Sequence, residues 1–270
     1  MTDMDKENLD FFDLLLKSVA KESFFEAFWD KEILHISRND DNYFHEIITG
    51  KKIEEWLTYT DLRHPTVVLE KNGRTSPDIW TVQHRHHHYN DGRIAKKNHL
   101  KSLFRKGHTI LVKDFSSAVF FPELAKSLEE LRKLFPGKLE DNLIVSCPNQ
   151  PAFVKHYDKE HVFAFQISGE KEWSFFDKYA DNLRGEDIIF PFSFPAKKVV
   201  KMQPGDLLYI PPCLNHQTKT IGEEPSVSVS ISIDLFNGTD FFKYIVQNSY
   251  FENPELRKMM PSPVAEKNKR

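Results

Sequence analysis

Residues 156–177, HYDKEHVFAFQISGEKEWSFFD, decide the fold of this chain. Two runs of β-type residues, 162–168 and 171–177, lie on either side of Gly169. Glycine adopts backbone conformations that other residues avoid, so it suits the turn between two strands. The stretch therefore predicts short strands joined by tight turns.

A further β-type run carries His156 and Asp158, which are separated by Tyr157. Side chains alternate between the two faces of a strand, so the imidazole and the carboxylate should share one face. Downstream, residues 203–218, QPGDLLYIPPCLNHQT, present a turn, a short apolar strand, a proline-rich bend and then His216. Two histidines and one carboxylate on a rigid sheet can hold non-heme Fe(II), with positions left for a bidentate 2-oxoacid and dioxygen. The three residues are candidate metal ligands.

The second half of the chain is a series of short strands separated by Pro- and Gly-containing turns. The expected strands are 142–147, 152–158, 162–168, 171–177, 197–202, 207–210 and 226–234. Earlier β-type runs begin near residues 66, 79 and 109. Many short strands of this kind predict a sandwich or barrel, and a two-sheet jelly roll fits their number.

Helical patterns flank the strands. Residues 8–60 show apolar side chains at helical spacing, a helix is expected from Pro122 to Phe135, and a closing helix is expected over Asp240–Phe251. We expect a fold that is mainly β with helical flanks. The predicted divisions are an N-terminal helical covering region, the β domain, and a C-terminal helix with its tail, at 1–60, 61–238 and 239–270.

The composition excludes several classes of protein. The net charge of -3, from 37 Lys+Arg and 40 Asp+Glu, provides no general attraction to nucleic acid or to an anionic membrane. The acidic start MTDMDKENLD does not resemble a secretory signal, and no stretch has the length of a membrane span, so we expect a cytoplasmic protein. Two cysteines, Cys147 and Cys213, exclude a disulfide-dense scaffold and are expected to be buried thiols.

The ordered motifs resemble those of a known family. HYD, FAFQISGEKEWSFFD, PGDLLYIP, NHQT and SVSVSIS follow one another as strand, glycine turn, strand, loop and strand. This series resembles the JmjC hydroxylases, which include the asparaginyl hydroxylase of hypoxia-inducible factor and the ribosomal-protein oxygenases. FFEAFWDKEILHISR, at 24–38, is similar to the start of the ribosomal oxygenase group. The resemblance implies a double-stranded β-helix of the cupin/JmjC type.

The resemblance also implies the roles of particular residues. His156, Asp158 and His216 match the iron ligands of the family. Lys171 matches the residue that binds 2-oxoglutarate, and an ammonium group there can pair with the distal carboxylate of the cosubstrate. Two further residues, Asn142 and Ser232, match positions where related enzymes carry polar groups that help bind the cosubstrate.

The last strand supports a polar interior. Serines at even positions alternate with valine or isoleucine through residues 226–233, so one face is small and polar and the other is apolar. The sequence departs from the family at Ile144, where the ribosomal oxygenases carry tyrosine, and at Phe153 and Lys155, where smaller residues are usual. These departures bear on the cosubstrate shell and on the identity of the substrate.

Other histidines lie outside this pattern. HRHHHYND, at residues 84–91, is a polar tract that holds His84, His86, His87 and His88, and we expect a solvent-facing loop there. His161 opens the next expected strand and is interpreted as a surface or supporting histidine.

These features predict an Fe(II)- and 2-oxoglutarate-dependent dioxygenase that hydroxylates a side chain of a protein or peptide. The same chemistry on a free amino acid or small natural product is one alternative, and a non-catalytic cupin that binds a metal or ligand is another. A helix-mediated interaction scaffold would depend only on the N-terminal aromatic residues. The sequence gives no evidence for a nucleic-acid or membrane partner, and a homodimer is possible.

Overall fold

The computed structural model describes residues 10–86, 89–117, 119–177 and 195–258. Its helices are α1 (Phe11–Leu16), α2 (Lys21–Ala27), α3 (Gly50–Tyr59), η2 (Pro77–Ile79), α4 (Lys97–Arg105), α5 (Pro122–Leu134), α6 (Gly238–Glu252) and η3 (Pro254–Arg257). Its strands are β1 (Leu34–Ile36), β2 (Arg63–His64), β3 (Val67–Glu70), β4 (Thr81–His86), β5 (Tyr89–Ala95), β6 (Thr109–Lys113), β7 (Gly137–Ser146), β8 (Pro151–His156), β9 (His161–Ser168), β10 (Glu170–Phe175), β11 (Lys198–Met202), β12 (Leu207–Ile210), β13 (His216–Ile221) and β14 (Ser226–Leu235). The contacts divide the chain into two compact units, Met1–Asp234 and Leu235–Arg270.

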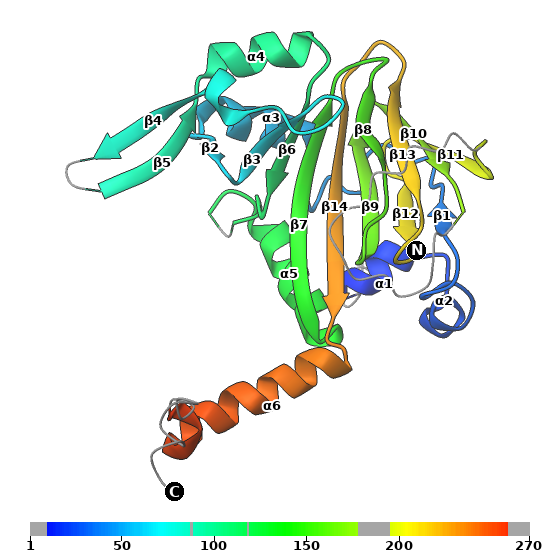
Figure 1. Cartoon of the computed structure of the whole chain (residues 1–270). Coiled ribbons are helices and arrows are strands. Elements are labelled where there is room, and N and C mark those ends of the chain that lie inside the picture. The colour runs from blue at the N-terminus through cyan, green and yellow to red at the C-terminus, as the bar shows by residue number, and fades with distance from the viewer. Residues whose placement is uncertain (1–9, 87–88, 118, 178–194, 259–270) are drawn as a thin grey trace, which may run out of the picture. The chain divides into compact units, whose positions relative to one another are not determined.

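Two antiparallel sheets make up most of the first unit (Figure 1). The major sheet has the strand order β1-β12-β9-β14-β7-β6-β3, and the minor sheet has the order β11-β10-β13-β8. Chain neighbours such as β8 and β9 lie in different sheets, as expected when a chain winds between the two layers of a jelly roll. The expected double-stranded β-helix is confirmed.

Alternation along β14 determines what lies on each side of the major sheet. Val229, Ile231 and Ile233 are fully buried on one face, whereas Ser226, Ser228 and Ser230 are buried on the other. Lys171 of the minor sheet donates a hydrogen bond to Ser228, so the serine side of the major sheet faces the minor sheet. The expectation of a small, polar inner face is therefore confirmed for these serines.

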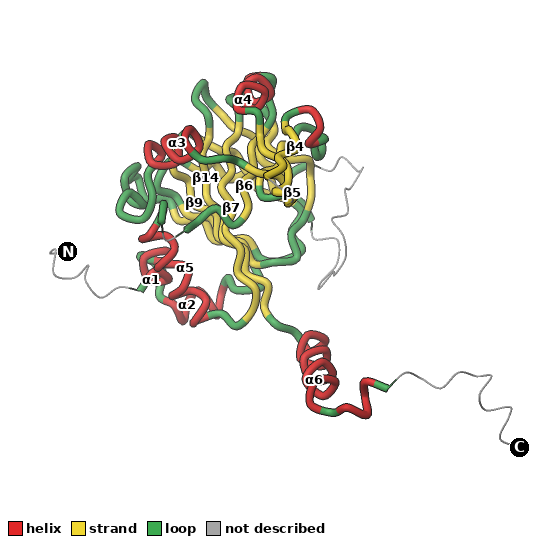
Figure 2. Tube along the Cα trace, turned by 90° about the vertical axis from the view of Figure 1, so that its left-hand side faces the viewer, coloured by secondary structure: helices red, strands yellow, loops and turns green. Residues whose placement is uncertain are grey.

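The outer face of the major sheet is covered by helices. Figure 2 shows α1, α2 and α5 together at one end of the sheet. Phe12 and Phe24, from α1 and α2, pack against Phe163 of β9, with ring centroids 6.0 Å and 5.8 Å away. Residues 8–60 are not wholly helical, however, because β1 pairs with β12 and extends the sheet. This short edge strand is too brief to show a periodic pattern in the sequence.

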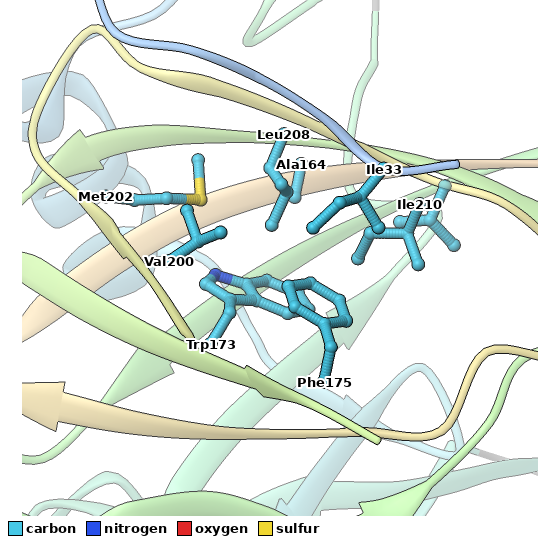
Figure 3. Packing of buried hydrophobic residues seen from close by; sticks show 9 residues of the cluster. Ile33, Ala164, Trp173, Phe175, Val200, Met202, Leu208 and Ile210 are labelled. Carbon is cyan, nitrogen blue, oxygen red and sulfur yellow. The ribbon is translucent and has the colours of Figure 1, made fainter. Parts of the chain in front are cut away.

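Part of the space between the sheets is filled by an apolar cluster (Figure 3). Its members come from the facing strands β9, β10, β11 and β12 and from the residue before β1. They are Ile33, Val162, Ala164, Trp173, Phe175, Val200, Met202, Leu208 and Ile210. Buried polar side chains, by contrast, lie on β13 and β14, among them Thr218, Thr220 and Ser228.

Two further segments differ from the expectations. HRHHHYND was expected to be a loop, but β4 extends through His86 and β5 begins at Tyr89. His86 is opposite Tyr89 in the register of these two strands, and the backbone pairing of a ladder does not require apolar side chains. His87 and His88 lie outside the described residues. Likewise NHQT is not a loop throughout, since β13 begins at His216.

The second unit is built around α6. Asn237 caps its first turn, and the Asn237 and Asp240 side chains form a reciprocal capping box. The expected closing helix over Asp240–Phe251 is confirmed. Among the helices of the described segments, none combines the length and the apolar character that a membrane span requires.

Candidate metal centre

Two neighbouring strands of the minor sheet bring the candidate ligands together. β8 ends at His156, β13 begins at His216, and these two residues are directly opposite each other in the register. Asp158 follows two residues after His156. One Oδ of its carboxylate lies 3.7 Å from His156 Nε2 and the other lies 3.6 Å from His216 Nε2. One atom from each of the three residues lies within 4.8 Å of the others, so a single cation could contact all three.

The backbone orients both imidazoles. His156 Nδ1 lies 2.8 Å from the Val154 carbonyl oxygen, and His216 Nδ1 lies 3.0 Å from the Leu214 carbonyl oxygen. An Nδ1–H that donates to a carbonyl leaves the Nε2 lone pair available, and both Nε2 atoms point toward Asp158. Burial, together with the neighbouring His156, lowers the pKa of His216 to about 4. The ring is therefore neutral at physiological pH, as a metal ligand must be.

A hydrogen-bonded loop fixes His216 relative to the other strand. The Cys213 N–H donates to the Asp158 carbonyl oxygen at 2.7 Å. Asn215 Nδ2 donates to the Asp177 carbonyl oxygen at 2.6 Å, and the Phe176 N–H donates to the Asn215 carbonyl oxygen at 2.8 Å. These hydrogen bonds thus connect the segment that precedes His216 to Asp158 and to the two residues that follow β10.

Lys171 lies deeper between the sheets. Its side chain is 1% exposed, and Nζ donates to Ser228 Oγ on the facing sheet at 2.7 Å. Burial lowers the pKa of Lys171 to about 7, from an ordinary value of 10.5. Because desolvation is the cause and no neighbouring anion opposes it among the described residues, the ammonium form lacks a counter-charge. A buried cation of this kind would pair strongly with an entering carboxylate.

The register of β10 and β13 shows in which order the site residues lie along the two strands. Phe175 is opposite His216, Trp173 is opposite Thr218, and Lys171 is opposite Thr220. Residues directly opposite each other share a face of the sheet, so these three pairs all point between the sheets. The His216 ring lies 5.5 Å from Trp173 and 6.3 Å from Phe175. Aromatic side chains therefore shield the histidine from water on this side.

Thr218 and Thr220 were not singled out from the sequence. Both are buried, and the structure places them on the same face of β13 as His216. The signal was available in HQTKT, where threonines follow the histidine at every second position. It was missed because this segment was interpreted as a loop.

The remaining candidates lie on strands of the major sheet. Asn142 is half-buried on β7, opposite Lys113 of β6, and its role stays a prediction. Ser232 is half-buried on β14, at an even position like Ser228. Of the two interpretations of His161, surface or supporting, the surface one is wrong. Its ring is 7% exposed, stacks on Trp29 at 3.8 Å and bonds to the Tyr209 hydroxyl at 2.9 Å, so it belongs to the packing under α2.

A comparison with protein families agrees with this geometry. Residues 120–241 match the model of the JmjC domain. This part of the chain is similar to the JmjC domain. The matched region runs from the start of α5 through β14, and it includes all three candidate ligands and Lys171.

Several curated proteins are distant relatives of this chain. The chain is 25% identical over 228 residues to the bifunctional lysine-specific demethylase and histidyl-hydroxylase NO66 of Culex quinquefasciatus, covering 80% of this chain and 33% of that protein. It is 23% identical over 265 residues to ribosomal oxygenase 1 of Rattus norvegicus, covering 93% of this chain and 42% of that protein. The chain thus spans between a third and a half of the length of these two relatives.

A solved structure shares the fold of the JmjC domain. YcfD, a ribosomal oxygenase from Escherichia coli solved in complex with cobalt and 2-oxoglutarate, aligns with a TM-score of 0.55 at 18% identity. The alignment covers 91% of this chain and 59% of that one. At this identity the similarity establishes the fold.

Proposed function

We propose that the protein is an Fe(II)- and 2-oxoglutarate-dependent dioxygenase that hydroxylates a side chain of a protein or peptide. The observation that carries the proposal is the cluster of His156, Asp158 and His216. Two imidazoles whose Nδ1 atoms face backbone carbonyl oxygens, together with one carboxylate, are the ligand set that holds non-heme Fe(II) with open coordination positions.

The residues between the sheets also fit the cosubstrate. Lys171 provides a buried cation without a counter-charge, and Ser228 holds it in place. When bound, Fe(II) and 2-oxoglutarate activate dioxygen and release succinate and carbon dioxide as the substrate is hydroxylated. The chain supplies binding, orientation and the exclusion of water. Lys171 would hold the distal carboxylate, and the Val154 and Leu214 carbonyls would keep the two imidazoles aligned.

A protein substrate is the preferred interpretation because of the relatives. Their names describe a histidyl-hydroxylase, a lysine-specific demethylase and ribosomal oxygenases, all of which act on proteins or ribosomes. A free amino acid or small natural product would be oxidised by the same chemistry. The two alternatives can be separated by incubating the iron-loaded protein with 2-oxoglutarate and a cell extract. Mass spectrometry would then show the mass gain of one oxygen atom either on peptides or on small molecules.

The central test measures metal binding and turnover separately. Asp158→Asn keeps the shape of the side chain but removes its charge, and His216→Ala removes one nitrogen ligand. Each should abolish iron-dependent release of succinate and weaken Fe(II) binding by at least about tenfold, since one of a few strong bonds is lost. His99→Ala, at an exposed position on α4, is the matched control and should retain both properties. Full turnover by Asp158→Asn or His216→Ala would refute the proposal and favour a different metal site.

A homodimer remains a prediction. Taken by itself, α6 carries seven exposed large apolar side chains, Phe241, Phe242, Tyr244, Ile245, Val246, Tyr250 and Phe251. Such a surface is suited to packing against another helix. Sedimentation of the full chain over a range of concentrations would test self-association, and a monomer throughout would contradict it.

A cytoplasmic location also stays a prediction, supported by the composition of the sequence. Cell fractionation with an antibody against the chain would test it. Recovery with the membrane or nuclear fraction would contradict it.

A further inference from the structure

Two threonine hydroxyls on β13 lack a hydrogen-bond partner although they are buried. Thr218 is 3% exposed and Thr220 is 0% exposed. Among the described residues, none forms a hydrogen bond with either Oγ1. Buried polar groups in native proteins are nearly always paired, so an unpaired hydroxyl indicates a partner such as water or a ligand.

Both hydroxyls lie in the part of the interior that connects the candidate ligands with Lys171. Thr220 is directly opposite Lys171 on β10, and Thr218 is the next inward residue toward His216. At about 3.3 Å per residue, the two threonines lie about 7 Å and 13 Å beyond His216 along the strand. The pair therefore spans the distance between the metal end of the site and the buried ammonium.

The charges nearby determine which ligand suits these groups. Lys171 Nζ and the threonine hydroxyls are donors, and Ser228 Oγ already accepts a bond from Lys171. A carboxylate offers about four lone-pair sites, so it can accept from an ammonium group and from hydroxyls at the same time. A second cation would be repelled by Lys171, and an apolar group would leave the hydroxyls unpaired.

We propose that Thr218 and Thr220 are cosubstrate-binding residues, whose hydroxyls donate to the distal carboxylate of 2-oxoglutarate beside Lys171. This inference rests on the proposed function and extends it to a wall of the site formed by β13. The two threonines would distinguish a dicarboxylic 2-oxoacid from a monocarboxylic one, because only the former has an acceptor at this end.

The test compares two 2-oxoacids in the same variants. 2-Oxoglutarate and pyruvate share the group that chelates the metal, but pyruvate has no distal carboxylate. Each is titrated into the full chain loaded with Fe(II) under anaerobic conditions, and the metal-to-ligand charge-transfer band reports binding without turnover. The variants are Thr218→Val, Thr220→Val and the double variant. Thr109→Val is the control, since Thr109 is also buried with an unpaired hydroxyl but lies on β6, which β7 separates from β14.

The double variant should bind 2-oxoglutarate about 10- to 100-fold more weakly, the loss expected when hydrogen bonds to a charged group are removed. Its affinity for pyruvate and for Fe(II), and every affinity of Thr109→Val, should stay within about threefold of wild type. Thr218→Ser with Thr220→Ser keeps the hydroxyls and should restore 2-oxoglutarate binding relative to the double valine variant.

Three results would overturn the assignment. Unchanged 2-oxoglutarate affinity in the double variant would mean that water, and not the cosubstrate, satisfies the hydroxyls. Equal weakening toward both oxoacids would indicate a general structural defect. If wild type bound Fe(II) but gave no charge-transfer band with 2-oxoglutarate, the proposed function itself would fail, and this assignment with it.

Discussion

Binding of 2-oxoglutarate should take up a proton, and the amount should depend on pH in a way fixed by Lys171. The Lys171 side chain is fully buried and lacks a counter-charge, and this desolvation lowers its pKa to about 7. The difference from the ordinary 10.5 corresponds to about 5 kcal/mol of disfavoured charge. An entering carboxylate favours the ammonium form, so the pKa of Lys171 rises again in the complex.

The magnitude follows from this value. With a pKa of about 7, about nine tenths of the free protein lacks the Lys171 proton at pH 8, and about one tenth lacks it at pH 6. Because the complex keeps Lys171 charged at both pH values, binding should take up about 0.9 proton at pH 8 and about 0.1 at pH 6. Affinity should consequently fall as pH rises above 7 and level off only above the pKa of the complex.

Isothermal titration calorimetry measures the proton count directly. 2-Oxoglutarate is titrated into anaerobic Fe(II)-loaded protein in buffers of different ionisation enthalpy at one pH. The slope of observed enthalpy against buffer enthalpy gives the protons exchanged. Pyruvate serves as the control ligand, because it reports any proton exchange at the metal and does not contact Lys171.

Lys171→Arg is the matched variant, since arginine remains charged at every pH of interest. Its binding should be weaker than that of wild type because its geometry differs, but the proton uptake should disappear. If wild type bound 2-oxoglutarate at pH 8 with no more uptake than pyruvate, then Lys171 would already be charged in the free protein or would not receive the distal carboxylate. Either finding would refute this reasoning.

Two further predictions concern the scaffold and the His-rich hairpin. Gly205→Ala should lower the free energy of unfolding by about 2 to 4 kcal/mol, because Gly205 has a φ of +87° and a Cβ there would overlap the Asp40 carbonyl oxygen. Urea denaturation measures this change. An unchanged midpoint would show that the loop rearranges to accommodate the methyl group. The double variant His84→Ala with His86→Ala should bind Fe(II) and turn over 2-oxoglutarate within about threefold of wild type, because both histidines precede the region, residues 120–241, that matches the JmjC domain. Loss of iron would place the metal elsewhere.

The parts of the fold that the sequence predicted are those with an apolar face or a clear turn. β9, β10, β12 and β14 were expected within a residue or two of their observed bounds, because each shows an apolar run or strict alternation. β1 was missed because a strand of three residues between helices shows no period. The hairpin of β4 and β5 was missed because its tip is polar, and backbone pairing leaves no compositional signal.

The candidate ligands could be predicted because few residue types bind iron, and three of them occurred in an ordered context of strands. Lys171 came from the family resemblance, and the structure adds its burial and its bond to Ser228. Thr218 and Thr220 could not be predicted in the same way, since threonine is common in strands and carries no functional signal by itself. Their unpaired hydroxyls become informative only when burial and register are known.

β13 and its two threonines, Thr218 and Thr220, escaped prediction for one physical reason. The inward face of β13 carries His216, Thr218 and Thr220, so it lacks the apolar alternation by which a buried strand is recognised. Burial of so polar a face is unfavourable unless something pairs with it. The apolar cluster around Trp173 lies on the strands β9 to β12 and on Ile33. A polar side chain pattern on the buried face of a strand is therefore itself evidence for a ligand, and here it indicates the same region as the metal ligands and Lys171.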